Sequence, residues 1–135
     1  MSADLAISTN FRISHDYESA ILIRKDQPDV IIGDFYGDPE VALIDAEERW
    51  CAVAGCGLIV YFLKKPYIPY RYDQHTEQYF EVGRKQTDLW WVSAIEQTGP
   101  FSIRVSCDNG VQHQLSFSQY AECCVSVPSL QNSSP

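Results

Sequence analysis

The chain has no long apolar segment and no sequence that marks a secreted protein. Its longest apolar run, residues 58–63, is far too short to span a bilayer. Residues 1–6 contain neither a basic region nor a long apolar region, so no signal peptide is predicted. We therefore expect a cytoplasmic protein.

The motifs of many enzymes and cofactor sites are also missing. The glycines form no GxGxxG fingerprint, no two histidines stand in HxH or HxxxH spacing, and no serine lies within Gly-x-Ser-x-Gly. The acids do not follow the spacing of an EF-hand loop. We therefore expect no cofactor, no metal site and no catalytic residue.

The five cysteines are an odd number and include no CxxC pair, which indicates reduced thiols when no secretory signal is present. Cys51 and Cys107 lie in apolar strand patterns and are predicted to be small core residues. Cys123 and Cys124 are adjacent, so on a strand they would point to opposite faces and would not readily bind one zinc ion. A cysteine–histidine pair stays open, because such partners meet in space rather than in sequence.

Basic residues are few and unevenly placed. Ten lysines and arginines stand against eighteen acids, for a net charge of −8. Residues 26–48 contain eight acids and no base, whereas residues 51–135 contain seven acids and six bases. This asymmetry argues against nucleic acid or an anionic membrane as the ligand, since both require a basic surface. It suits a cationic partner, and equally a merely solvated surface.

The chain is rich in short strand patterns and shows no amphipathic helix. The fold class predicted is mostly β, with an antiparallel meander forming a sandwich or a rolled barrel-like sheet and little helix. Asp108-Asn109-Gly110 predicts a hairpin with a type I′ turn. The predicted strands are 5–13, 20–25, 30–32, 41–44, 49–54, 57–63, 88–96, 101–107, 111–117 and 121–127.

We expect one β-rich domain over residues 1–127 and a flexible tail over 128–135. Residues 64–84 form the longest predicted excursion from the sheet, because prolines exclude a regular helix or central strand there. Within it, residues 76–82 are predicted as one or two helical turns or a loop. Trp90 and Trp91 are adjacent on a predicted strand, so one should face the core and the other the outside.

The acidic turn 31–45 is the most distinctive stretch, and three readings of it stay open. Asp34 and Asp38 flank Phe-Tyr-Gly, so they could bond the backbone of the turn, bind a partner, or act as an acid–base or metal-binding pair. The third reading leads to an alternative function, a small β-barrel hydrolase or isomerase that uses Asp34, Asp38 and a histidine.

A resemblance favours the second reading. The run Gly33-Asp-Phe-Tyr-Gly-Asp-Pro39, followed by Ala42, Ile44-Asp45, Trp50-Cys51-Ala-Val53, Gly55 and Gly57-Leu-Ile-Val-Tyr61, resembles a segment of bacterial immunity proteins. These belong to polymorphic toxin systems that act by contact or type VI secretion. At the turn before the last strand of this segment, Gly55-Cys56-Gly57 departs from the Gly-Glu-Gly that is usual there. The resemblance implies a small, non-enzymatic protein that blocks or distorts a toxin's active site.

The leading hypothesis is thus an immunity protein whose acidic surface binds a toxin with a basic active-site cleft, and aromatic residues of the long loop add contacts. A homo-oligomer paired through edge strands is a further alternative. The predicted partner-binding residues are Asp34, Tyr36, Asp38, Glu40, Asp45, Glu47, Glu48, Tyr67, Tyr70 and Tyr72.

Overall fold

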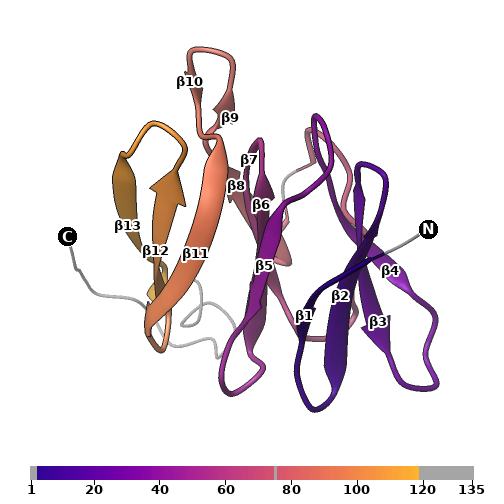
Figure 1. The fold of residues 1–135 in the computed structure, drawn as a ribbon. Coiled ribbons are helices and arrows are strands. Elements are labelled where there is room, and N and C mark those ends of the chain that lie inside the picture. The colour runs from indigo at the N-terminus through magenta and orange to yellow at the C-terminus, as the bar shows by residue number, and fades with distance from the viewer. Residues whose placement is uncertain (1–2, 75, 119–135) are drawn as a thin grey trace.

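The computed structural model describes residues 3–74 and 76–118, and three open antiparallel sheets lie side by side in it as layers (Figure 1). The antiparallel β sandwich is therefore confirmed, and the sheets do not close into a barrel. The N-terminal sheet contains β1 (Ala3–Ile7), β2 (Phe11–Asp16), β3 (Ser19–Arg24) and β4 (Val30–Asp34). The central sheet contains β5 (Val41–Ile44), β6 (Trp50–Gly55), β7 (Gly57–Phe62) and β8 (Tyr79–Val82). The C-terminal sheet contains β11 (Val92–Gly99), β12 (Ser102–Cys107) and β13 (Gln112–Ser116), and β9 (Arg84–Lys85) and β10 (Asp88–Leu89) form a separate hairpin.

The central sheet is buried on both faces, which explains the continuous apolar sequence of β6 and β7. Every residue of these two strands is buried. Successive side chains point to opposite faces of a strand, so Val53 and Ile59 pack against the N-terminal sheet, and Ala52 and Val60 pack against the C-terminal sheet. Two hydrophobic cores result, one on each side of the central layer.

The outer sheets keep the alternation of half-buried strands. In β12 the buried residues are Ile103, Val105 and Cys107, as the sequence pattern predicts. Trp90 is buried and Trp91 is 48% exposed, which confirms that the two indoles face opposite sides.

Three predicted segments differ from the structure. Residues 5–13 are a hairpin rather than one strand, because Ser8 N donates to Phe11 O and closes a turn between β1 and β2. Residues 76–82 contain β8 instead of helical turns or a loop, since pairing with β7 places alternate side chains on the two cores. The predicted strand 88–96 is interrupted at residues 90–91, where Trp91 makes an isolated bridge with Cys56.

The Asn-Gly hairpin forms at the predicted place, but the type I′ assignment is wrong. In this turn only Gly110 has a positive φ, of 86°. Gly110 N donates to Cys107 O at 3.0 Å, which makes a four-residue turn with Asp108 and Asn109 at its centre. The left-handed residue follows the turn instead of lying within it, as in a type I turn with a glycine bulge.

The sandwich has two ends that carry different parts of the sequence. We define the upper end by loop 35–40, turn 55–57 and hairpin 84–89, and the lower end by turns 8–10, 25–29, 45–49 and 100–101 (Figure 1). The predicted strand 121–127 and tail 128–135 lie outside the described residues, so the domain boundary stays a prediction.

Candidate functional site

The eight acids of residues 26–48 do not form one surface in the folded chain. β5 runs between Glu40 and Asp45 and takes the chain from the upper end to the lower end (Figure 1). The acidic stretch is therefore divided between opposite ends. The exposed acids form two groups, which are Asp34, Asp38 and Glu40 at the upper end and Asp26, Asp29 and Glu47 at the lower end.

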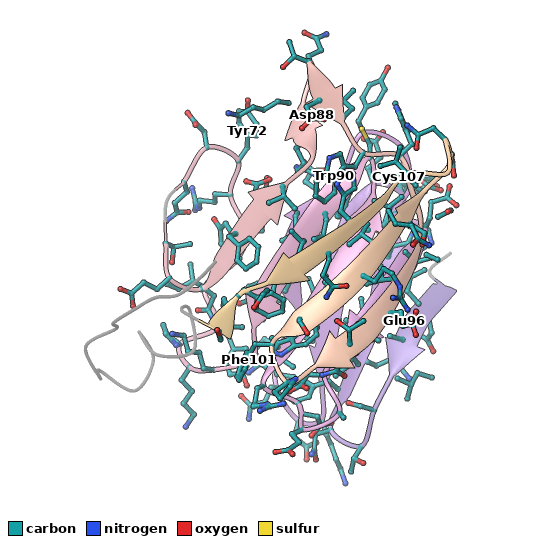
Figure 2. The ribbon with its side chains drawn as sticks, turned by 90° about the vertical axis from the view of Figure 1, so that its left-hand side faces the viewer. Tyr72, Asp88, Trp90, Glu96, Phe101 and Cys107 are labelled. Carbon is teal, nitrogen blue, oxygen red and sulfur yellow. The ribbon has the colours of Figure 1, made fainter. Side chains whose placement is uncertain are left out.

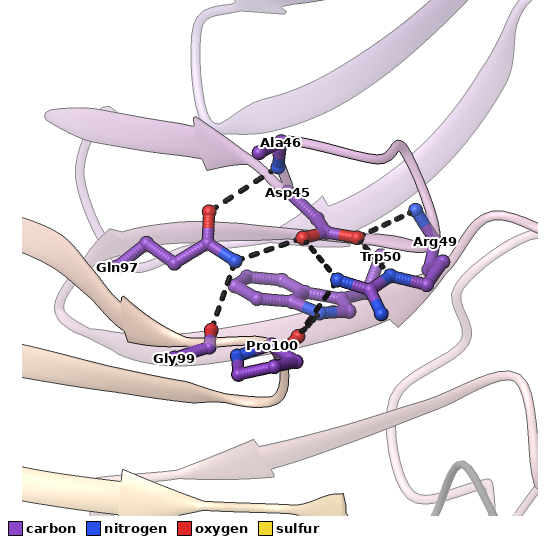
Figure 3. A network of polar contacts seen from close by, with 7 residues as sticks. All are labelled: Asp45, Ala46, Arg49, Trp50, Gln97, Gly99 and Pro100. Atoms are coloured by element: carbon purple, nitrogen blue, oxygen red, sulfur yellow. Dashed lines mark hydrogen bonds and ion pairs between the residues drawn. The ribbon is translucent and has the colours of Figure 1, made fainter.

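The prediction that Asp45 belongs to the partner-binding surface is wrong, because the structure buries this residue. Its carboxylate accepts hydrogen bonds from Arg49 Nε at 2.6 Å, from the Arg49 backbone at 2.9 Å and from Gln97 Nε2 at 2.8 Å (Figure 3). Burial raises the pKa of Asp45, but these hydrogen bonds outweigh it and hold the pKa below its ordinary value. Nearby, Trp50 Nε1 donates to Pro100 O at 2.8 Å. The network joins the central sheet to the C-terminal sheet.

Glu48 joins the central sheet to the N-terminal sheet at the same end. Its carboxylate accepts hydrogen bonds from the Ser8 hydroxyl, from the Asn10 backbone at 2.9 Å and from the Asn10 side chain at 2.6 Å. These hydrogen bonds lower the pKa of Glu48. Of the predicted acids at the lower end, Glu47 alone remains an exposed charge. Turn 45–49 thus holds both outer sheets to the middle layer.

The predicted tyrosines of the long loop have different environments. Tyr67 is partly buried beneath Arg24, whose guanidinium carbon lies 4.2 Å from the ring centre. Tyr70 is 7% exposed and donates its hydroxyl to Glu81 at 2.9 Å, so it is not available to a partner. Tyr72, by contrast, is 84% exposed. Two of the three rings therefore attach the loop to the domain, and one faces solvent.

Tyr36 and Tyr72 line one open concavity at the upper end, although they are far apart in sequence. Tyr36 is 79% exposed and lies on loop 35–40. The concavity has a volume of about 1180 Å³. Figure 2 shows Tyr72, Asp88 and Trp90 in the same part of the molecule. The charged residues in its lining are Asp73, Glu81, Arg84, Lys85 and Asp88.

Arg84 fixes the position of loop 35–40 beside this concavity. Its guanidinium donates to the carbonyl oxygens of Asp34 and Cys56, and its Nε lies 2.7 Å from Glu81 Oε1. It also covers the Phe35 ring, with 4.8 Å from the guanidinium carbon to the ring centre. The positive charge of Arg84 is thus engaged by the domain itself.

A smaller neighbouring hollow, of about 320 Å³, is not predictable from the sequence pattern. Trp91 lines it, and so does His113, whose ring stacks on Trp90 with centroids 3.8 Å apart. The Trp-Trp pair was the available signal, since one indole must leave the core. The position of Trp91 beside the hairpin 84–89 depends on the break between β10 and β11, and the apolar pattern of the sequence does not show that break.

The alternative hydrolase or isomerase needs Asp34, Asp38 and a histidine, and the structure describes two of the three histidines, His15 and His113. Asp34 and Asp38 are exposed and line neither of these two hollows. His113 stacks on Trp90, and His15 Nδ1 lies 2.9 Å from Tyr17 O. Across residues 3–74 and 76–118, no three His, Cys, Asp or Glu side chains gather in a way that could hold a metal ion. Burial raises the pKa values of Cys51 and Cys107, which disfavours the reactive thiolate. Cys123, Cys124 and His75 lie outside the described residues.

Comparisons of the chain with protein-family models, with curated proteins and with solved structures found no match. The described residues include no helix of the length and apolar character needed to cross a membrane.

Proposed function

We propose that this protein is a cytoplasmic immunity protein that binds a cognate toxin domain through its upper end and neutralises it. The observation that carries the proposal is the pair Tyr36 and Tyr72, which are 79% and 84% exposed and line one concavity. Exposed aromatic side chains that line one concavity together are typical of an interaction site, and tyrosine is enriched at binding hot spots.

The acids beside Tyr36 support a cationic partner. Asp34 and Asp38 are exposed on or beside the loop that carries Tyr36. Arg84, the nearby base, donates to the backbone carbonyl of Asp34 and pairs with the carboxylate of Glu81. Such acids steer a positively charged partner towards the site, and the tyrosines then supply contact area that slows dissociation.

The mode of neutralisation follows from the same features. A toxin that acts on nucleic acid or nucleotides has a basic cleft, because it must bind phosphate. At the upper end, the carboxylates of Asp34 and Asp38 would enter such a cleft, and the rings of Tyr36 and Tyr72 would contact its rim. Occupation of the cleft would exclude the substrate and requires no chemistry from the immunity protein.

The test uses the toxin domain that this proposal expects to be encoded by the neighbouring large open reading frame, made catalytically inactive. Tyr36→Ala and Tyr72→Ala should each raise the Kd by about 10-fold or more, as hot-spot truncations do. Ile7→Ala is the control, because Ile7 is 69% exposed but lies beside the lower-end turn 8–10. An unchanged Kd in both tyrosine variants would refute the proposed interface.

Self-association through unpaired strand edges remains a prediction. Light scattering of the pure protein over a range of concentrations tests it, and a constant monomer mass would rule it out.

A further inference from the structure

The C-terminal sheet is one strand narrower than the central sheet in the described part of the chain. The central sheet has the order β5-β6-β7-β8, and the C-terminal sheet has the order β11-β12-β13. β11 packs over β5 and β6. No described strand pairs with the outer edge of β13.

The side chains of β8 show the consequence of this mismatch. Phe80 and Val82 face the core between the two sheets but are only partly buried, whereas Leu58 and Val60 on the adjacent strand are fully buried. Val82 and Leu115, from the edge strands of the two sheets, both line the concavity of about 1180 Å³. The concavity therefore has an apolar floor beside an open strand edge.

The backbone of β13 presents alternate residues to that open edge. Phe117 N donates to Phe101 O at 2.8 Å, and Cys107 N donates to Val111 O at 2.9 Å. In an antiparallel ladder these bonds recur at every second residue, so His113 and Leu115 bond to β12. The amides and carbonyls of Gln112, Gln114 and Ser116 then point away from β12.

Charge distinguishes between the segments that could fill this position. Arg84 is paired with Glu81, so the charges left in the concavity are Asp73, Asp88 and Lys85. Arg84 also donates to the backbone carbonyl of Asp34, which places that residue beside the concavity. The chain after Ser118 has no lysine or arginine and one acid, and a second copy of the chain carries a charge of −8. The segment after Ser118 therefore supplies no basic side chain, and a second copy is repelled by its own net negative charge, whereas the toxin of the proposed function is basic.

We propose that an extended, lysine- or arginine-containing segment of the cognate toxin adds to the edge of β13 as a fourth strand. This inference rests on the proposed function. Backbone hydrogen bonds to Gln112, Gln114 and Ser116 supply affinity, and apolar side chains of the segment cover Val82 and Leu115. The cationic side chains reach Asp73 and Asp88, and this fixes the direction and register of the added strand.

The experiment is hydrogen exchange of the full-length protein, alone and with the inactive toxin domain. The amides of Gln112, Gln114 and Ser116 should exchange rapidly in the free protein and at least 10-fold more slowly in the complex. The amides of His113 and Leu115 are the internal control, since β12 already protects them and their exchange should change much less.

A proline variant supplies an independent arm. Gln114→Pro removes one outward amide and should raise the Kd for the toxin domain at least 10-fold without lowering the Tm of the free protein. Gln114→Ala keeps the amide and should bind like the wild type. Strand addition is refuted if the toxin binds, the Kd of Gln114→Pro equals that of the wild type, and the edge amides exchange equally fast in the free protein and the complex. The proposed function would still stand in that case.

Two other outcomes also refute the inference. Protection of the edge amides in the free protein would mean that residues 119–135 or a second copy fill the position, and dependence on protein concentration separates these two. If the toxin domain does not bind at all, the proposed function itself fails.

Discussion

Gln97 on β11 donates a hydrogen bond of 2.8 Å to the buried carboxylate of Asp45, which follows β5. This contact spans two sheets and links residues 52 positions apart in the sequence. The Glu48 contacts to Ser8 and Asn10 do the same for the other outer sheet. Asp45 and Glu48 therefore hold the layers together at the lower end, whereas the exposed aromatics and acids that we propose to bind a partner lie at the upper end.

Asp45→Ala should destabilise the protein by about 2–3 kcal/mol, because it leaves Arg49 and Gln97 without their shared acceptor. The measurement is the free energy of unfolding in urea. Glu47→Ala is the matched control, since Glu47 is exposed in the same turn, and it should change stability by less than about 0.5 kcal/mol. Equal effects of the two substitutions would contradict the structural role of Asp45.

Stability should fall in acid because of the same two carboxylates. The folded pKa values of Asp45 and Glu48 lie below their ordinary values of 3.8 and 4.5, so the unfolded chain binds more protons. Their contribution is complete above the ordinary values and is lost as the pH falls through the folded ones. Urea midpoints between pH 7 and pH 2 measure this loss. Asp45→Asn and Glu48→Gln should each give a shallower fall than the wild type, and an identical slope would argue against the linkage.

Glu48 also combines two opposing effects that mutation can separate. Its φ of 59° is unfavourable for a residue with a side chain, whereas its carboxylate holds turn 8–10. Glu48→Ala and Glu48→Gly both lose the carboxylate, but glycine tolerates the positive φ. We expect the glycine variant to be more stable than the alanine variant by about 1 kcal/mol in urea unfolding. The reverse order would mean that this backbone conformation is not retained in solution.

Local patterns predicted most of the strands. The alternation of 101–107, the apolar run 57–63 and the opposite faces of Trp90 and Trp91 are consequences of strand periodicity, and the structure has all three. Periodicity does not say how many layers cover a strand. The two hydrophobic cores of the fold show that β6 and β7 are buried on both faces.

The candidate site was less predictable, because charge along a sequence does not define a surface. Four residues of β5 suffice to carry Glu40 and Asp45 to opposite ends, so the acidic run 26–48 is divided. Tyr72 and Tyr36 were both predicted to bind a partner, but only the fold brings them to one concavity. Tyr70 and Tyr72 have the same side chain, but Tyr70 is buried and donates its hydroxyl to Glu81, whereas Tyr72 is exposed.

The measurement that tests the account most directly compares the association of the inactive toxin domain with two charge-reversal variants. Asp34→Lys with Asp38→Lys alters the upper end, and Asp29→Lys with Glu47→Lys makes the same change in net charge at the lower end. We predict that the upper-end variant lowers the association rate constant about 10-fold or more and weakens its dependence on salt, while the lower-end variant stays near the wild type. Equal association rates for the two variants would contradict binding through the upper end.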